Sequence, residues 1–127
     1  MKKAAIVLCM LVSCAFLCSQ NPQLLADINP GPQGSIPYNL QELNGHLLFQ
    51  AYEPIHGRQL WVTDGGTAGT TLLKEVVSPQ FPPGIFSRFY ARDEHAWVWA
   101  RENGQETRLW RTDGTTAGTE LLFTSFE

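Results

Sequence analysis

The sequence predicts an all-β fold of two four-stranded antiparallel repeats, each built like one blade of a β-propeller. The first observation is that the motif LWVTDGGTAGT at residues 60–70 returns as LWRTDGTTAGT at 109–119, after 49 residues. The second is that the similarity continues into the flanks, because 44–51 corresponds to 93–100 and 71–73 to 120–122. The third is that no segment has a helical period of useful length. A repeat of this length with one Trp and one Asp-Gly turn per unit is typical of a propeller blade.

Turn residues divide the first repeat, residues 36–77, into four expected strands. Asn44-Gly45 is the strongest short-range hairpin signal, and Pro54 with Gly57 marks a longer loop. Together with the turn that opens at Asp64, these loops separate strands expected at 38–43, 46–52, 58–63 and 70–77. LLADI at 24–28 parallels LLKEV at 72–76, so we also expect a leading strand there.

The second repeat, residues 85–126, follows the Pro-rich and Gly-containing break at 78–84. Its strands are expected at 86–92, 95–101, 107–112 and 119–126. Asn103-Gly104 supplies the tight turn between the second and third of these strands. We expect almost no helix after residue 19.

The repeated residues have structural explanations. Trp61 and Trp110 are expected in mid-strand, where a large ring fills the wedge between neighbouring blades, and burying one removes ~150–250 Å² of surface from water. The Asp that opens each third turn can accept hydrogen bonds from the following amides, the glycines permit positive φ, and a Thr begins each last strand. The residues that define the repeat are Leu60, Trp61, Asp64, Gly65, Gly69, Thr70, Leu109, Trp110, Asp113, Gly114, Gly118 and Thr119.

The first nineteen residues are typical of a secretory signal peptide rather than of a folded element. Lys2 and Lys3 precede an apolar run at 4–17, which is too short to span a bilayer, since spanning needs roughly 20 apolar residues. We therefore expect an exported domain at 20–127, located in the periplasm, on the envelope or outside the cell.

Two processing routes fit this segment. Residues 11–14, LVSC, match the bacterial lipobox, in which Cys14 is acylated and anchors the mature protein to a membrane. Cys18 has a better distance from the start but follows a Leu, and ordinary cleavage near residues 18–20 fits equally well. Cys9 is the third cysteine, so the exported domain is expected to contain neither an intrachain disulfide nor a thiolate metal site.

The charge balance excludes two classes of partner. The whole chain has a formal charge of −3, and without Lys2 and Lys3 the exported part carries seven Lys and Arg against twelve acids, a charge of −5. Nucleic acids and anionic membrane surfaces attract basic proteins, so neither is expected as a partner. Membrane contact is expected only through a lipid anchor.

The repeats resemble the bacterial extracytoplasmic ELWxxDGT repeat proteins. The matching elements are the NPG at 29–31, NG at 44–45, HG at 56–57, QLW at 59–61, TDG at 63–65, AGT at 68–70 and LKEV at 73–76. Gln59 and Arg108 stand where this family prefers Glu, and Gly66 stands where it prefers Thr. The resemblance implies a propeller-like array outside the cytoplasm, and it implies no substrate, no cofactor and no catalytic residue.

Metal-binding interpretations are weaker than structural ones. Asp64 and Asp113 each offer one carboxylate per loop, whereas Ca²⁺ prefers 6–8 oxygen ligands, so we expect turn caps. His46 and His95 are repeat-equivalent, which favours a structural role. His56 has no Cys or acidic partner at the spacing of a zinc ligand set.

Catalytic patterns are also weak. No GxSxG elbow or phosphate-binding loop occurs. Glu53 and Glu102 are repeat-equivalent and could form a carboxylate pair on one rim, although repetition again favours structure. Aromatic residues of the second repeat are denser than a two-blade core needs, which indicates a protein or carbohydrate contact surface beside core packing: Phe81, Phe86, Phe89, Tyr90, Trp97 and Trp99.

Two repeats are fewer than the 4–8 blades of a closed propeller, and repeat arrays usually need three or more units. The chain could be a truncated relative of a longer array, copies of it could associate edge to edge, or its two units could pack face to face as a small open β structure. We expect self-association through the edge strand at 120–126. The predicted function is a non-enzymatic binding or scaffold module that contacts protein or glycan. The alternative is the remnant of a carbohydrate-active hydrolase or an enzyme accessory domain, which acids gathered at one mouth would favour.

Overall fold

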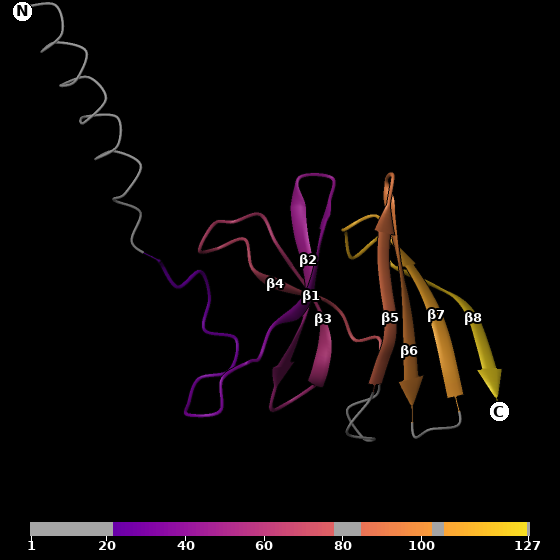
Figure 1. Cartoon of the computed structure of the whole chain (residues 1–127), viewed down its shortest axis with the longest axis horizontal. Helices are drawn as coiled ribbons and strands as arrows, with labels where there is room; N and C mark the ends of the chain where they lie inside the picture. Colours follow the sequence, from indigo (N-terminus) through magenta and orange to yellow (C-terminus); the bar gives the residue numbers. More distant parts are fainter. Residues whose placement is uncertain (1–21, 78–84, 103–105, 127) are drawn as a thin grey trace, which may run out of the picture.

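The structure, a computed structural model, describes residues 22–77, 85–102 and 106–126, and it contains two four-stranded antiparallel sheets (Figure 1). The first sheet consists of β1 (Tyr38–Leu43), β2 (His46–Glu53), β3 (Gly57–Thr63) and β4 (Thr71–Lys74), in that order. The second consists of β5 (Ile85–Arg92), β6 (His95–Glu102), β7 (Glu106–Thr112) and β8 (Glu120–Phe126). The described residues form no helix. The predicted all-β class and the two four-stranded antiparallel sheets are confirmed.

The first hairpin of each sheet turns on two residues. Asn44 and Gly45 have φ of 52° and 76°, the positive values that a type I′ turn needs. Asp93 takes the place of Asn44 in the second repeat and also has positive φ, 54°. Asp tolerates this left-handed conformation better than most residues, so β5 and β6 also connect through two residues, but Glu94 lacks the positive φ of Gly45 and the turn is not type I′. The predicted turn at Asn103-Gly104 lies outside the described residues.

The last strand of the first sheet is shorter than predicted. We expected 70–77, whereas β4 ends at Lys74. The amides of Val76 and Val77 donate to Gln59 Oε1 at 2.9 and 3.3 Å, and Gln59 Nε2 donates to the Val77 carbonyl at 2.7 Å. The side chain of Gln59 therefore satisfies the backbone groups that a strand ladder would otherwise satisfy.

The predicted leading strand at 24–28 is wrong. This stretch has no strand pairing, and Leu24 is 74 % exposed. Figure 1 shows the segment 22–37 beside the first sheet, on the side opposite the second sheet. Because it lies against a face of the sheet rather than along an edge, its backbone groups find no ladder to join.

The core lies between the two sheets. Directly opposed residues of neighbouring strands share one face of a sheet, and the pairs Leu48–Val62 and Val98–Trp110 mark the two faces that meet. We call them the inner faces and their reverse sides the outer faces. The main inner-face residues of the first sheet are Leu43, Leu48, Gln50, Leu60, Val62, Leu73 and Lys74, and those of the second are Phe89, Ala96, Val98, Ala100 and Trp110.

Polar contacts tie the sheets together at one end and along the side. The Asn44 side-chain amide donates to the carbonyls of Glu94 at 3.2 Å and Asp113 at 3.0 Å. Lys74 Nζ lies 5.9 Å from the centre of the Trp110 ring, a cation–π contact across the interface. These contacts and the shared apolar core join the two repeats into one packed unit.

Candidate binding sites

A polar cleft lies at the end of the molecule where the hairpins of both sheets turn, at the top of Figure 1. Its volume is about 500 Å³. The residues that line it come from both repeats: Asn44, His46, Glu94, His95, Asp113, Gly114 and Thr115. This wall offers neutral donors, ring nitrogens and carboxylates together with apolar atoms, so it can form hydrogen bonds with a ligand and also pack against its apolar groups.

The repeat explains why two histidines reach the same cleft. His46 is the first residue of β2 and His95 the first residue of β6, so equivalent positions of two sheets that lie side by side meet at one end. His46 Nδ1 is 3.1 Å from the Asn44 carbonyl, which orients its ring on the hairpin turn. The His95 ring packs at 6.2 Å from the Trp97 ring. Sequence reasoning treated these histidines as structural and did not place them together.

Asp113 carries the negative charge of the cleft on a rigid loop. Its Oδ1 accepts hydrogen bonds from the Thr115 hydroxyl at 2.7 Å and from the Thr115 amide at 2.8 Å. These two donors, with a smaller electrostatic contribution from His95, lower the pKa of Asp113 below its usual value. Asp113 is therefore a carboxylate at neutral pH and an acceptor for ligand donors.

The two repeat loops use the same hydrogen bonds. Asp64 Oδ1 accepts from the Gly66 amide at 2.7 Å, as Asp113 does from Thr115, so the predicted turn caps are present. Gly65 and Gly114 have positive φ of 87° and 94°, as expected.

The predicted reason for the later glycines, Gly69 and Gly118, is wrong, because neither has positive φ. A Cβ at Gly69 would lie 1.7 Å from Asp64 Oδ1, and one at Gly118 would lie 2.2 Å from the Asp113 carboxylate. These positions are Gly because the Asp side chain folds back against the backbone there.

Sequence reasoning missed a pair of threonines in each repeat. Thr70 bonds to Thr63 through their hydroxyls at 2.8 Å, and Thr119 to Thr112 at 2.7 Å. Thr70 and Thr119 lie one residue before β4 and β8, where we expected them to begin the last strand. The signal was present in the sequence, because Thr63 and Thr112 also repeat at the 49-residue spacing.

The two repeated tryptophans have different surroundings. Trp110 packs against the core between the sheets, as predicted for a ring that fills the space between repeats, and Leu60 is fully buried there. Trp61 is half-buried on the outer face of the first sheet, opposite Phe49 and Leu72. Leu109 is half-buried on the outer face of the second sheet, because the two sheets stack in the same orientation and the inner face of the first repeat corresponds to the outer face of the second.

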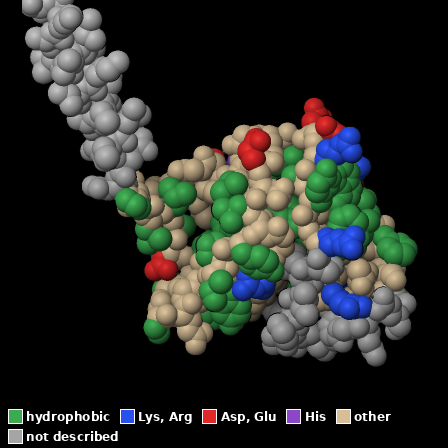
Figure 2. Space-filling view, in the orientation of Figure 1, with side chains coloured by type: hydrophobic (Ala, Val, Ile, Leu, Met, Phe, Trp, Pro, Cys, Tyr) green, Lys and Arg blue, Asp and Glu red, His purple; other side chains and the backbone are tan. Residues whose placement is uncertain are grey.

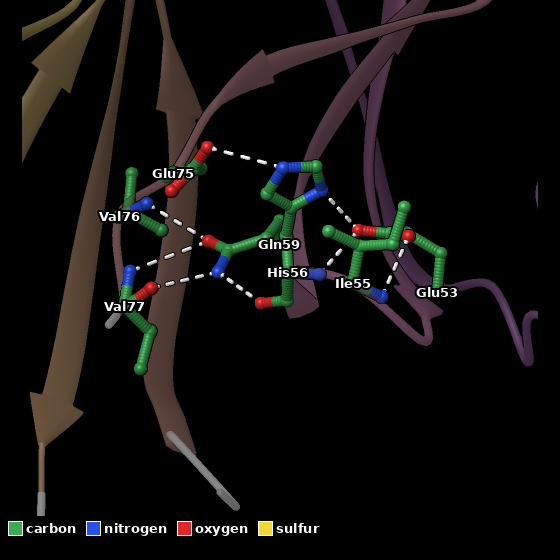
Figure 3. Close-up of polar contacts among 7 residues, drawn as sticks. All are labelled: Glu53, Ile55, His56, Gln59, Glu75, Val76 and Val77. Atoms are coloured by element: carbon green, nitrogen blue, oxygen red, sulfur yellow. Dashed lines mark hydrogen bonds and ion pairs between the residues drawn. The ribbon is translucent and has the colours of Figure 1, made fainter. Parts of the chain in front are cut away.

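A second polar group locks the loop between β2 and β3 (Figure 3). Glu53 Oε1 accepts from the His56 amide at 2.6 Å and Oε2 from the Ile55 amide at 3.0 Å, and the His56 ring pairs with Glu53 through Nδ1. His56 Nε2 lies 3.4 Å from Glu75 Oε1. The prediction for His56 considered only the spacing of metal ligands and so missed these two acidic partners, Glu53 three residues before it and Glu75, which folding brings to it.

The Glu53 carboxylate is committed to this loop. Burial alone would raise its pKa, but the hydrogen bonds from Ile55 and His56 and the nearby imidazole outweigh burial and lower the pKa. Glu102 is the last residue of β6, and its side chain lies outside the described residues. Glu53 therefore stabilises the loop between β2 and β3 and is not free to form a carboxylate pair on a rim.

The outer face of the second sheet displays aromatic side chains. Tyr90 is exposed, and Trp97 and Trp99 are half-buried beside it on neighbouring strands. Phe89 points the other way and belongs to the core. Phe81 and the side chain of Phe86 lie outside the described residues. Over β5–β8, Figure 2 shows hydrophobic side chains interspersed with basic ones, which are all arginines in this part of the sequence.

Two further observations bear on chemistry. Among the described side chains, no three or more His, Cys, Asp or Glu residues are grouped as a metal ion would require. No helix within the described ranges has the length and apolarity to cross a membrane. The expected signal peptide at 1–19, with Cys14, lies outside those ranges.

Comparison of the chain with protein-family models, with curated proteins and with solved structures finds no match.

Proposed function

We propose that the protein is an exported, non-enzymatic binding or scaffold module of the ELWxxDGT repeat type, which contacts protein or glycan through the polar cleft. The cleft is the observation that carries this proposal, because it is built from both repeats and gathers several hydrogen-bonding side chains. Its volume of about 500 Å³ lies within the range of small-ligand sites, about 300–1,000 Å³. Sugar hydroxyls and protein main-chain groups are the ligands that suit such a wall.

The two sheets act in this proposal as neighbouring blades of a propeller-like array. β1 and β5, the first strands of the two repeats, lie next to each other, as the innermost strands of adjacent blades do around an axis. Ligands of such arrays bind where the loops of several blades meet. The export proposal rests on the basic and then apolar order of residues 1–19, and a lipid on Cys14 would hold the module at the envelope.

A carbohydrate-active hydrolase remnant is the second candidate. It is favoured by one observation, that Glu94 and Asp113 both line the cleft. Glycoside hydrolysis needs one protonated and one ionised carboxyl group. Asp113 has a lowered pKa and would be the ionised group, so the acid would have to be Glu94.

The experiment is an NMR titration of the ¹⁵N-labelled protein with chitotetraose, cellotetraose and maltotetraose, each up to about 10 mM, which detects even weak binding in the millimolar range. We expect amide shifts at residues 44–46, 94–95 and 113–115 for at least one sugar. The variant His95→Ala should lose them, and Ile55→Ala, in an exposed loop away from the cleft, should keep them. Shifts confined to other residues would contradict the cleft as the glycan site. Release of new reducing ends, abolished by Glu94→Gln, would favour the hydrolase.

A further inference from the structure

The outer face of the second sheet corresponds, in the repeat, to the inner face of the first sheet, which packs on the second sheet. At the 49-residue spacing, Leu60 corresponds to Leu109 and Leu73 to Leu122. Leu73 is 2 % exposed in the core between the sheets, whereas Leu122 is 46 % exposed. Phe123, at 59 % exposure, occupies the position of Lys74, which contacts Trp110. A surface that binds a neighbouring sheet in the first repeat is thus presented uncovered, and with large apolar side chains, in the second.

The structure also shows what this kind of surface binds. The inner face of the first sheet packs on the Trp110 face of the second. The repeat equivalent of that receiving face is the outer face of the first sheet, where Trp61 corresponds to Trp110, Phe49 to Val98 and Leu40 to Phe89. One molecule therefore carries a surface of each kind on opposite sides, and neither of them packs on a sheet of the same molecule.

The receiving face is incompletely filled by its own chain. A cavity of about 390 Å³ lies between the segment 22–37 and the outer face of the first sheet, with Leu25, Leu40 and Phe49 in its wall. Leu40 is 53 % exposed. Residues 24–28 make no ladder hydrogen bonds, so they can be moved from the face at small cost.

Charge favours unlike faces over like faces. Arg88, Arg92 and Arg111 stand on strand positions of the outer face of the second sheet. Arg111 pairs with Glu120 on the same face and Arg92 with Asp93 of the adjoining hairpin, so these acids offset part of the positive charge, but pairing two such faces would still bring like charges together. The outer face of the first sheet carries Glu42, with Asp27 in the segment beside it, and its described strand positions carry no Lys or Arg. Complementary charge therefore orients one copy head to tail on the next.

We propose that the outer face of the second sheet binds the outer face of the first sheet of another copy of this chain, so that copies stack head to tail. Phe123 then lies over Trp61 of the next copy, as Lys74 lies over Trp110 within one copy. Such a heterologous contact forms a ring if the rotation closes. Two, three or four copies would give the 4–8 sheets of a closed propeller. The contact does not involve the polar cleft and stands independently of the proposed ligand.

One element of the internal contact does not carry over. Asn44 donates its amide hydrogens across the sheets, but its equivalent is Asp93, whose carboxylate would face carbonyl oxygens of the next copy. The contact between copies is therefore weaker than the internal one. Asp93→Asn restores the donor and should tighten association about ten-fold, the effect of one to two net hydrogen bonds.

The test is the mass of the purified protein by light scattering after size exclusion, over a range of concentrations. We expect a multiple of the mass of the purified chain, which is 14.2 kDa for all 127 residues and smaller once the signal peptide has been removed. Phe123→Asp removes one face and Leu40→Asp the other, and each variant alone should be monomeric. An equimolar mixture should form a dimer of one copy of each, because every variant keeps one intact face. Ile55→Asp, an exposed apolar residue away from both faces, should associate as the wild type does.

Circular dichroism of each variant serves as the control that it is folded. A wild-type monomer at every concentration up to about 100 μM, some hundred-fold above a micromolar Kd, would overturn the proposal. So would a mixture of the two variants that stays monomeric. Association that survives Leu40→Asp but not Phe123→Asp would show like faces pairing or edge pairing through β8, and would overturn the head-to-tail arrangement.

Discussion

The two sheets have the same topology and the same motif, yet they differ in which face is covered. In the first sheet one face packs on the second sheet and the other lies under residues 22–37. In the second sheet the Trp110 face is covered and the reverse face, with Tyr90 and Phe123, is open to solvent. Equivalent residues therefore contribute unequally to stability. The shared motif determines the fold of each repeat, whereas the burial of each face determines how much its residues contribute to the free energy of unfolding.

The largest expected effect is on a matched pair of leucines. Leu60 is fully buried between the sheets, so Leu60→Ala should lower the free energy of unfolding by about 2–5 kcal/mol. Its equivalent Leu109 is half-buried, and Leu109→Ala should cost about 1 kcal/mol, because less surface is withdrawn from water. Urea unfolding followed by Trp fluorescence measures both. Equal losses would contradict the difference between the faces.

The next effect concerns the end of the last strand. Gln59 replaces a strand ladder for Val76 and Val77, and Gln59→Ala leaves their amides without this partner, at a cost of about 1–3 kcal/mol. The equivalent Arg108 forms an ion pair with Glu106 at 2.5 Å, and Arg108→Ala should cost at most about 1 kcal/mol. Hydrogen exchange is the second readout. Faster exchange at Val76 and Val77 is expected only in the Gln59 variant, and unchanged exchange there would refute the role given to this side chain.

A gain in stability is expected from Gln50→Leu. Gln50 is fully buried on the inner face of the first sheet, and neither of its amide atoms has a hydrogen-bond partner among the described residues. Leu has a volume similar to that of Gln and leaves no buried amide unsatisfied, so the substitution should raise the free energy of unfolding by about 1 kcal/mol. The midpoint of urea unfolding should rise accordingly. A loss of stability would indicate that the amide is satisfied in solution, for instance by water.

The smallest effect is on the pH dependence of stability. The pKa of Glu53 is lowered by folding, so its ionised form stabilises the protein above the unfolded pKa of about 4.3. This contribution is lost as the pH falls through the lower, folded-state pKa. Between about pH 6 and pH 3, Glu53→Gln should therefore lose less stability than the wild type. Parallel pH profiles for the two proteins would contradict the assignment.

Local signals predicted the sheets well because each is built from neighbouring residues. Asn44-Gly45 places a type I′ turn, and the repeat predicted eight strands within a few residues. The leading strand at 24–28 failed for a physical reason, since a strand also needs an edge to pair with and similarity to 72–76 carries no information on that edge. The predicted length of β4 was wrong for a similar reason. The buried Gln59 side chain takes the backbone hydrogen bonds that would otherwise continue the strand to residue 77.

Long-range contacts explain what the sequence could not show about the sites. Glu75 joins His56 from another strand, and the cleft exists because Asn44 of one sheet reaches Asp113 of the other. That the two tryptophans lie on equivalent faces of their own sheets follows from the repeat and could have been predicted. Which of those faces would be covered could not, because it depends on how the two sheets meet.

The packing of the inner faces is the central claim, and nuclear Overhauser effects in a ¹³C-labelled sample, diluted to its smallest species, test it most directly. A Cβ placed on Gly114 would lie 3.9 Å from the methyl carbons of both Leu43 and Leu48. We therefore predict cross-peaks from Gly114 to these leucine methyl groups, and from the Lys74 side chain to the Trp110 ring. Leucine methyl groups that show contacts only within the first sheet would contradict the account.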